Sequence, residues 1–193
     1  MCSLKTEDKI LNASILLFSQ KGYSAVTTKE IAKEAGVCEM TLFRHFENKH
    51  NLFEKTFDRF VFFPKYKALF DGLEWDLEKD LIKICSAYQH ILYKNRKIIL
   101  MYLKNEELNS DYNIELFRFP NEFKKLLNYY FEEMRHRGVI QENPDMLAIS
   151  FLRTNFGLFI TSLVMKKLTF ETDIQMSVLS YVKIFAKGIS SDK

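Results

Sequence analysis

Residues 27–46 have the sequence TTKEIAKEAGVCEMTLFRHF, and this stretch decides the fold. Thr27 and Glu30 have the spacing of a capping box, so a short helix is predicted to begin here and to end at Gly36. A second helix follows. Two helices joined at a glycine, with a small residue such as Ala32 where they cross closely, form a helix-turn-helix. The apolar residues expected to lock the two helices together are Ile31, Val37 and Leu42.

The second helix of this pair begins at about Cys38 and would present polar and bulky residues outward. In a helix-turn-helix, this outward face of the recognition helix meets the major groove of DNA. The outward residues are Glu39, Met40, Arg44 and His45. Taken alone, the stretch also fits a small helical hairpin with a glycine corner, so its neighbours must decide between the two.

The rest of the chain is predicted to be helical as well. Its 193 residues include 18 Phe and 9 Tyr but only 6 Gly and 3 Pro, too few for a protein of many short strands, which needs a turn every ~8–12 residues. We expect an all-α protein of about nine helices, with a three-helix front domain over 1–50 and a larger domain over 51–193. Pro120 should kink or divide one long helix. The helices are predicted over 6–21, 27–36, about 38–46, 48 towards 64, 77–93, 96–108, about 114–137, 146–167 and 172–189.

Several functional classes are excluded by absence of their patterns. The cysteines at 2, 38 and 85 have no metal-ligand spacing, and the first residues lack the apolar core of a signal peptide. The charge-free apolar stretch 154–165 is 12 residues long, short of the ~20 that a membrane span needs. We therefore expect a soluble cytoplasmic protein that binds no membrane.

An enzyme is also not expected. The four histidines form no metal-spaced pair, no nucleophile lies beside a candidate base, and no glycine-rich phosphate loop is present. The acidic pairs at 106–107 and 132–133 are typical of solvated helix faces. The sequence thus predicts no catalytic residue, no metal and no cofactor.

The residues around the helix-turn-helix are more specific than the motif itself. In order along about residues 6–57 occur Ile10-Leu11, Leu17-Phe18, Gly22-Tyr23, Thr27-Thr28, Ile31-Ala32, Ala35-Gly36-Val37, Thr41-Leu42-Phe43, His45-Phe46, Asn48-Lys49 and Leu52-Phe53. This series resembles the DNA-binding head of the tetracycline-repressor (TetR) family of bacterial transcriptional regulators. The resemblance implies an all-α homodimer whose rear domain binds a small molecule and controls the DNA affinity of the heads.

The resemblance also implies which residues contact DNA. Lys49 falls at the start of the fourth helix, where a lysine and backbone N–H groups meet phosphate. Arg44 fits a bidentate contact to guanine or, equally well, a phosphate contact, and Glu39 could accept from cytosine N4. His45 fits a phosphate contact or packing against the first helix. The implied DNA-binding residues are Thr28, Lys29, Glu39, Met40, Thr41, Phe43, Arg44, His45 and Lys49.

Three residues depart from the family pattern. Phe43 stands where tyrosine is usual, so a phenolic hydroxyl for phosphate is absent. Cys38 replaces a common serine and weakens the helix cap. Met40 replaces a small residue or proline, which suggests contact with a thymine methyl or with backbone. Because of these departures, a helical protein-interaction module with a degenerate DNA-binding head is the alternative hypothesis.

Charge does not decide between these hypotheses. Residues 1–55 carry eight Lys or Arg against seven Asp or Glu, and the whole chain has a net charge of +3. Nucleic-acid-binding domains are often strongly basic. We therefore expect weak non-specific DNA binding and a dependence on dimerisation.

The rear domain is expected to dimerise and to bind a ligand. The helix over 146–167 is apolar nearly all round and contains Gly157, so it should face its own domain and a partner copy, although a central core helix in a monomer is the alternative. Aromatic residues with a few polar groups favour a small hydrophobic or aromatic effector. Repression of a palindromic operator is predicted, and activation is left open. The candidate ligand-binding residues are Trp75, Tyr88, Tyr102, Phe117, Phe123, Tyr130, Phe151, Asn155 and Phe159.

Overall fold

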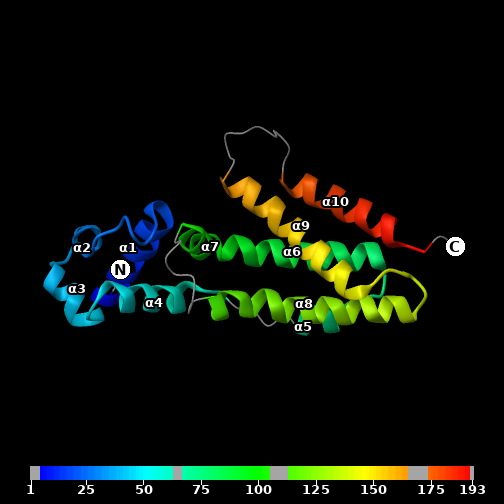
Figure 1. The fold of residues 1–193 in the computed structure, drawn as a ribbon, viewed down its shortest axis with the longest axis horizontal. Coiled ribbons are helices and arrows are strands. Elements are labelled where there is room, and N and C mark those ends of the chain that lie inside the picture. Colours follow the sequence, from blue (N-terminus) through cyan, green and yellow to red (C-terminus); the bar gives the residue numbers. More distant parts are fainter. Residues whose placement is uncertain (1–4, 63–66, 105–112, 165–173, 192–193) are drawn as a thin grey trace. The chain divides into compact units, whose positions relative to one another are not determined.

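The computed structural model describes residues 5–62, 67–104, 113–164 and 174–191, and the side chains at 5–62, 67–104, 120–163 and 176–191. These residues form ten helices and no strand, so the all-α prediction is confirmed (Figure 1). The helix that the sequence did not predict is α5 (Lys67–Asp71), a single short turn before Gly72. By contact the chain divides into two compact units, and each is described by itself.

The first unit combines residues 1–62 with residues 94–113. Helix α1 packs against α2, α4 and α7, and α2 packs against α3. Its core includes the fully buried side chains of Ile10, Phe18, Ile31 and Leu42. Two of the three residues expected to lock α2 to α3, Ile31 and Leu42, are therefore buried, whereas Val37 is half-buried. The helices of this unit are α1 (Thr6–Lys21), α2 (Thr28–Ala35), α3 (Glu39–Phe46), α4 (Lys49–Phe60) and α7 (Arg96–Leu103).

Local signals set the ends of α1 and α2 as the sequence predicts. The Thr27 hydroxyl accepts from the Glu30 N–H while the Glu30 carboxylate accepts from the Thr27 N–H, which completes the capping box. Gly36 ends α2 in the left-handed conformation, with φ of 68°. Gly22 ends α1 with φ of 86°, and a Cβ there would lie 2.8 Å from the backbone oxygen of Lys104. Only glycine therefore allows α1 and the end of α7 to approach this closely.

A buried asparagine joins the end of α4 to the start of α7. The Asn95 amide accepts from the Phe62 N–H at 2.7 Å and donates to the Phe62 carbonyl at 3.0 Å. Asn95 is 6% exposed, so both polar groups of its side chain are satisfied away from solvent. Phe62, two residues beyond the end of α4, is thereby held against the start of α7.

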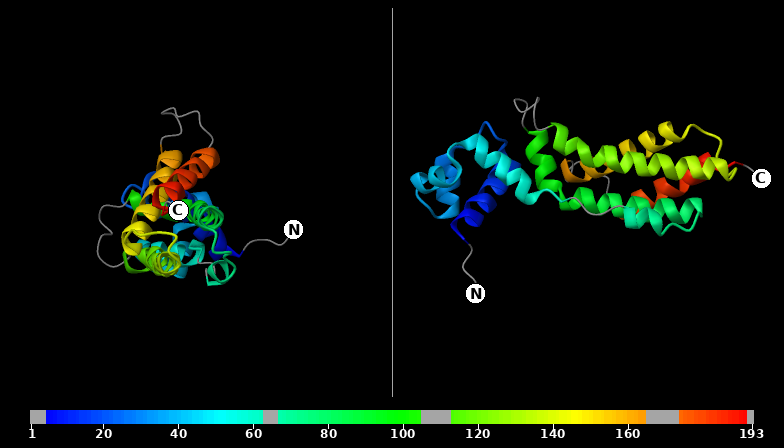
Figure 2. Two further views of the ribbon diagram at one scale, coloured as in Figure 1. Left: turned by 90° about the vertical axis from the view of Figure 1, so that its right-hand side faces the viewer. Right: turned by 90° about the horizontal axis from the view of Figure 1, so that it is seen from below.

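The second unit combines residues 63–93 with residues 114–193. Helices α9 and α10 lie side by side in the views of Figures 1 and 2. Helix α8 runs through Pro120 without a break, so of the two outcomes expected at this proline, a kink or a division, the division does not occur. The expected ends at 108, 167 and 172 lie outside the described residues. The helices of this unit are α5, α6 (Leu77–Lys94), α8 (Asn113–His136), α9 (Pro144–Val164) and α10 (Ile174–Ile189).

Helix α9 is unusually apolar. The segment Pro144–Leu163 has a mean hydropathy of 1.4, which by length and composition alone would allow a membrane crossing, although its charge-free part is shorter. Only 33% of this segment is buried. The described residues therefore leave part of this apolar helix uncovered.

Candidate functional site

The candidate site begins at the N-terminal end of α3. Cys38 is the N-cap residue, and its side chain makes no capping hydrogen bond, as expected for a cysteine in place of serine. Its Sγ instead lies 3.1 Å from the Thr41 hydroxyl. Across the turn, the Thr28 hydroxyl donates to Glu39 Oε1 at 2.6 Å. Thr28 and Glu39 are both expected to contact DNA, and they lie on different helices of the motif. The structure shows that they are hydrogen-bonded to each other.

The outward face of α3 carries the residues that the sequence places there. Met40 is 82% exposed and Phe43 is 41% exposed, which is unusual for large apolar side chains. Arg44 and His45 are exposed on the same helix, and Lys29 is exposed at the start of α2. This face combines apolar and cationic groups. Apolar side chains suit contact with the methyl groups of thymine, and cationic side chains suit contact with phosphates.

Lys49 begins α4 and is held in place by an aromatic cluster. Its Nζ lies 4.2 Å from the centre of the Tyr23 ring, a cation–π contact. Tyr23 in turn meets Phe53 edge-on at 5.2 Å and Phe18 at 5.6 Å. The N-terminus of α4 is capped by the Asn48 side chain, which accepts from a backbone N–H at 2.8 Å. A helix N-terminus with a fixed lysine beside it is favourable for a phosphate.

Hydrogen bonds lower the pKa values of two side chains in this unit. The pKa of Glu30 is lowered to about 2 by the Thr27 backbone N–H, the Lys21 ammonium and the Thr27 hydroxyl. The pKa of Cys38 is lowered by the Thr41 hydroxyl and by backbone N–H groups at the start of α3. The pKa of Glu30 is low because its carboxylate accepts the hydrogen bonds of the capping box that starts α2. The lowered pKa of Cys38 increases the fraction of this thiol that is ionised to thiolate.

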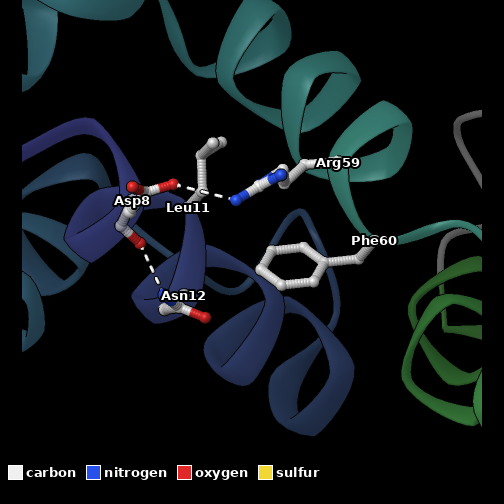
Figure 3. A pocket seen from close by; sticks show the side chains of 5 residues that line it. All are labelled: Asp8, Leu11, Asn12, Arg59 and Phe60. Carbon is white, nitrogen blue, oxygen red and sulfur yellow. Dashed lines mark hydrogen bonds and ion pairs between the residues drawn. The ribbon is translucent and has the colours of Figure 1, made fainter. Parts of the chain in front are cut away.

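A small pocket lies between α1 and the end of α4 (Figure 3). Arg59 reaches Asp8 at 3.2 Å, and the Asn12 amide donates to the Asp8 carbonyl at 2.7 Å. Leu11 and the Phe60 ring complete the lining. The pocket has about 160 Å³ of space, whereas sites for drug-sized ligands have ~300–1,000 Å³. The residues predicted to bind an effector do not line it.

The structure brings several of the predicted effector residues together in the second unit. The Trp75 and Tyr130 rings stack at 5.9 Å with an interplanar angle of 15°, and the Tyr88 and Phe123 rings lie 5.2 Å apart. The Asn155 side chain donates to the Phe151 carbonyl at 2.8 Å. Those of the predicted residues that are almost fully buried are Tyr88, Phe123, Tyr130, Phe151, Asn155 and Phe159.

Of the other two predicted effector residues, one lies in the first unit and the other has no described side chain. Tyr102 lies on α7, which belongs to the first compact unit. The side chain of Phe117 lies outside the described side chains, although its backbone belongs to α8.

Sequence reasoning missed the polar neighbours of Asn155. The Cys85 thiol donates to Asn155 Oδ1 at 2.7 Å, and the Gln89 amide donates to the Asn155 carbonyl at 2.9 Å. Asp80, which is fully buried, accepts from the Glu74 N–H at 2.9 Å and from the Tyr130 hydroxyl at 3.3 Å. No helical spacing marks the Cys85–Asn155, Gln89–Asn155 and Tyr130–Asp80 contacts, because each joins two different helices. Among the described residues, no group of three or more His, Cys, Asp or Glu is placed to hold a metal ion.

Known proteins resemble both the front of the chain and its whole length. Residues 10–56 match the family model described as "Bacterial regulatory proteins, tetR family". The HTH-type transcriptional regulator YvkB of Bacillus subtilis (strain 168) is 32% identical over 188 residues, which cover 97% of this chain and 98% of YvkB. The biofilm operon icaADBC negative transcriptional regulator IcaR of Staphylococcus aureus (strain Newman) is 38% identical over 50 residues, 26% of this chain and 27% of IcaR.

A solved structure has the same fold over nearly the whole chain. NalD, the secondary repressor of the MexAB-OprM multidrug efflux pump in Pseudomonas aeruginosa, superposes with a TM-score of 0.74, covers 97% of each chain and is 24% identical. The full-length likeness to a regulator and the family match over the helix-turn-helix agree with the geometry of α2 and α3. The chain belongs to the TetR family of bacterial transcriptional regulators, with an N-terminal DNA-binding head.

Proposed function

We propose that this regulator is a repressor that binds a palindromic operator as a homodimer in the cytoplasm and is released by a small hydrophobic or aromatic effector. The observation that carries the proposal is the face of α3 with exposed Met40, Phe43, Arg44 and His45. Lys49 at the start of α4 supplies a cation for the adjacent phosphate. IcaR, which is 38% identical to this chain over 50 residues, is a negative regulator, which favours repression over activation.

The dimer is supported by uncovered apolar side chains on the last two helices. On α10, the apolar side chains of Met176, Leu179 and Ile184 are all exposed. On α9, Met146 and Phe156 are exposed. A second copy is the partner that this surface fits, because a two-fold dimer also supplies two recognition helices for the two halves of an operator.

The effector is expected among the aromatic residues of the second unit. Tyr88, Phe123, Phe151 and Phe159 provide apolar walls, and Asn155 provides a polar group beside them. A ligand that separates these side chains must repack α6, α8 and α9, on which they lie. By linkage, the effector and DNA must then weaken each other's binding by the same factor.

The deciding experiment selects bound duplexes from a random-sequence pool with the full-length protein, followed by gel-shift assays with the selected site and candidate aromatic effectors. A palindromic consensus, occupied by a dimer and released by an effector, supports the proposal. A protein that retains no sequence would instead support the interaction module with a degenerate head. Placing the selected site between a promoter and a reporter gene distinguishes repression from activation.

A further inference from the structure

The hydrogen bond between Thr28 and Glu39 joins two helices at the predicted DNA-facing end of the motif. Thr28 is the first residue of α2 and Glu39 is the first residue of α3. Their side-chain oxygens lie 2.6 Å apart, and both residues are half-buried. A bond this short to a carboxylate is charge-assisted and holds both side chains in one arrangement.

This bond changes what each residue can offer to DNA. A threonine hydroxyl has one hydrogen, and here that hydrogen goes to Glu39 Oε1, so Thr28 has none to donate to a phosphate. Glu39 keeps Oε2 as an acceptor, next to the N-terminal end of α3, from which recognition helices contact base edges. The pair therefore presents an acceptor with negative charge and no donor.

Only one base suits such a group in the major groove. Guanine presents two acceptors there and thymine presents one, and both repel a carboxylate. Adenine presents a donor next to its own N7 acceptor, whereas the edge of cytosine itself presents only the N4 amino donor. Nearby phosphates repel the Glu39 carboxylate. Its presence therefore favours binding only at sites where it can accept a hydrogen bond from that amino group.

We infer that Thr28 and Glu39 act as one element of base recognition, in which Thr28 is a positioning residue that holds the Glu39 carboxylate towards the amino group of a cytosine in each operator half-site. The inference rests on the proposed function, since it needs sequence-specific DNA binding. The inference differs from the expectation that the two residues contact DNA independently. In the inference, the Thr28 hydroxyl binds the Glu39 carboxylate and does not bind the DNA backbone.

The competing explanation is a brace that only holds α2 against α3. A brace and a recognition element differ in one measurable way. Losing a brace or a phosphate contact weakens binding to all sequences alike, whereas losing a base contact changes the preference at one position. The base preference is therefore the decisive readout, and overall affinity is not.

The test is selection of bound duplexes, with sequencing of the pool, by the full-length protein and four variants. Glu39→Gln locates the position that Glu39 recognises and should move its preference from cytosine towards adenine, since glutamine pairs with adenine. Thr28→Val should weaken the cytosine preference there by about 5- to 150-fold, the range for one base contact, and leave other positions unchanged. Thr28→Ser, which keeps the hydroxyl, should retain the preference. Glu34→Gln removes one negative charge from an exposed site on α2 and should change no preference.

Each outcome decides the inference. A position that responds to Glu39→Gln and to Thr28→Val but not to Thr28→Ser supports it. It is overturned if Thr28→Val lowers affinity equally for all sequences, or if the position that responds to Glu39→Gln holds no cytosine in the wild-type consensus. If the wild-type protein selects no sequence at all, the proposed function fails and the inference fails with it. Urea unfolding of Thr28→Val confirms that a changed preference comes from a folded protein.

Discussion

Glu47 adopts a strained backbone conformation between α3 and α4. Its φ is 62° and its ψ is −49°, and the Phe46 carbonyl accepts from the Asn48 N–H at 2.6 Å, which makes a γ-turn. This conformation disfavours residues with a Cβ by about 1–3 kcal/mol. The chain tolerates it because the turn places the start of α4, with Lys49, directly after the recognition helix.

Replacing Glu47 with glycine should therefore stabilise the protein. The relief of strain exceeds the ~0.4–1 kcal/mol that glycine's freedom in the unfolded chain costs, so we expect Glu47→Gly to raise the free energy of unfolding by about 0.5–2 kcal/mol. Urea unfolding measures the difference. Glu47→Ala is the matched control, since it also loses the hydrogen bond from the Asn51 amide but keeps the Cβ. An equal gain in both variants would show that the backbone is not the cause.

The two cysteines of the described residues should differ sharply in reactivity. Cys38 is exposed and the Thr41 hydroxyl lowers its pKa, whereas burial raises the pKa of Cys85 to about 12. The thiolate is the reactive form, so in a Cys2→Ser background iodoacetamide at pH 7 should modify Cys38 and spare Cys85. Peptide mass mapping over time measures this. Thr41→Val removes the main cause of the lowered pKa and should slow the reaction at Cys38. An unchanged rate would contradict the assigned cause.

The start of α2 should depend on pH through Glu30. Its pKa falls from an ordinary value of 4.5 to about 2 in the folded protein, with the Thr27 backbone N–H as the largest cause. A carboxyl group whose folded pKa lies below its unfolded pKa stabilises the fold fully above the unfolded value. That stabilisation is lost as the pH falls from about 4.5 to about 2.

The matching experiment compares the wild type with Glu30→Ala by thermal unfolding from pH 7 to pH 2. The variant should be less stable at pH 7, where the capping box and its ionised carboxylate are intact in the wild type. The difference should shrink below pH 4.5, as Glu30 of the wild type gains a proton. Glu34→Ala, on an exposed site of the same helix, should show no such pH dependence. A constant difference across the range for Glu30→Ala would contradict the role of its charge.

The helices that the sequence could predict are those that begin and end by local rules. Thr27, Gly36 and Asn48 each act within three or four residues of themselves, and the structure confirms all three. The Asn95–Phe62 and Cys85–Asn155 contacts could not be predicted, because they join residues 33 and 70 positions apart. Their partners depend on how whole helices pack, which periodicity does not encode.

The same distinction between local and long-range contacts applies to the residues of the candidate sites. The residues of α3 lie on one short helix, so their spacing alone places Met40 and Arg44 on its outer face. The hydrogen bond between Thr28 and Glu39 joins two helices across the turn, so the spacing within either helix does not predict it. The sequence does not distinguish Tyr102 from the other aromatics of the middle helices, but packing of α7 against α1 places it in the first unit.

At the scale of the whole molecule, a single head has little charge with which to hold DNA. Residues 1–55 have a net charge of +1, so their non-specific attraction to phosphates is small. Joining two heads makes the second contact intramolecular and can raise overall affinity by 10²–10⁴-fold, an order-of-magnitude range, without any new contact. Operator binding should therefore depend strongly on the dimer.

Ile184→Glu tests this dependence. Ile184 is 73% exposed within one chain, so a glutamate there should not impair folding, but in the proposed dimer it would bury an unpaired charge at a cost of several kcal/mol. We expect sedimentation to show a dimer dissociation constant at least about 100-fold higher, and affinity for the selected operator to fall with it. Ser86→Glu is the matched control, since it adds the same charge to an exposed site on α6 and should leave both measurements unchanged. A monomeric Ile184→Glu variant that still binds the operator with full affinity would mean that one head suffices, and a variant that remains dimeric would place the dimer contact away from Ile184.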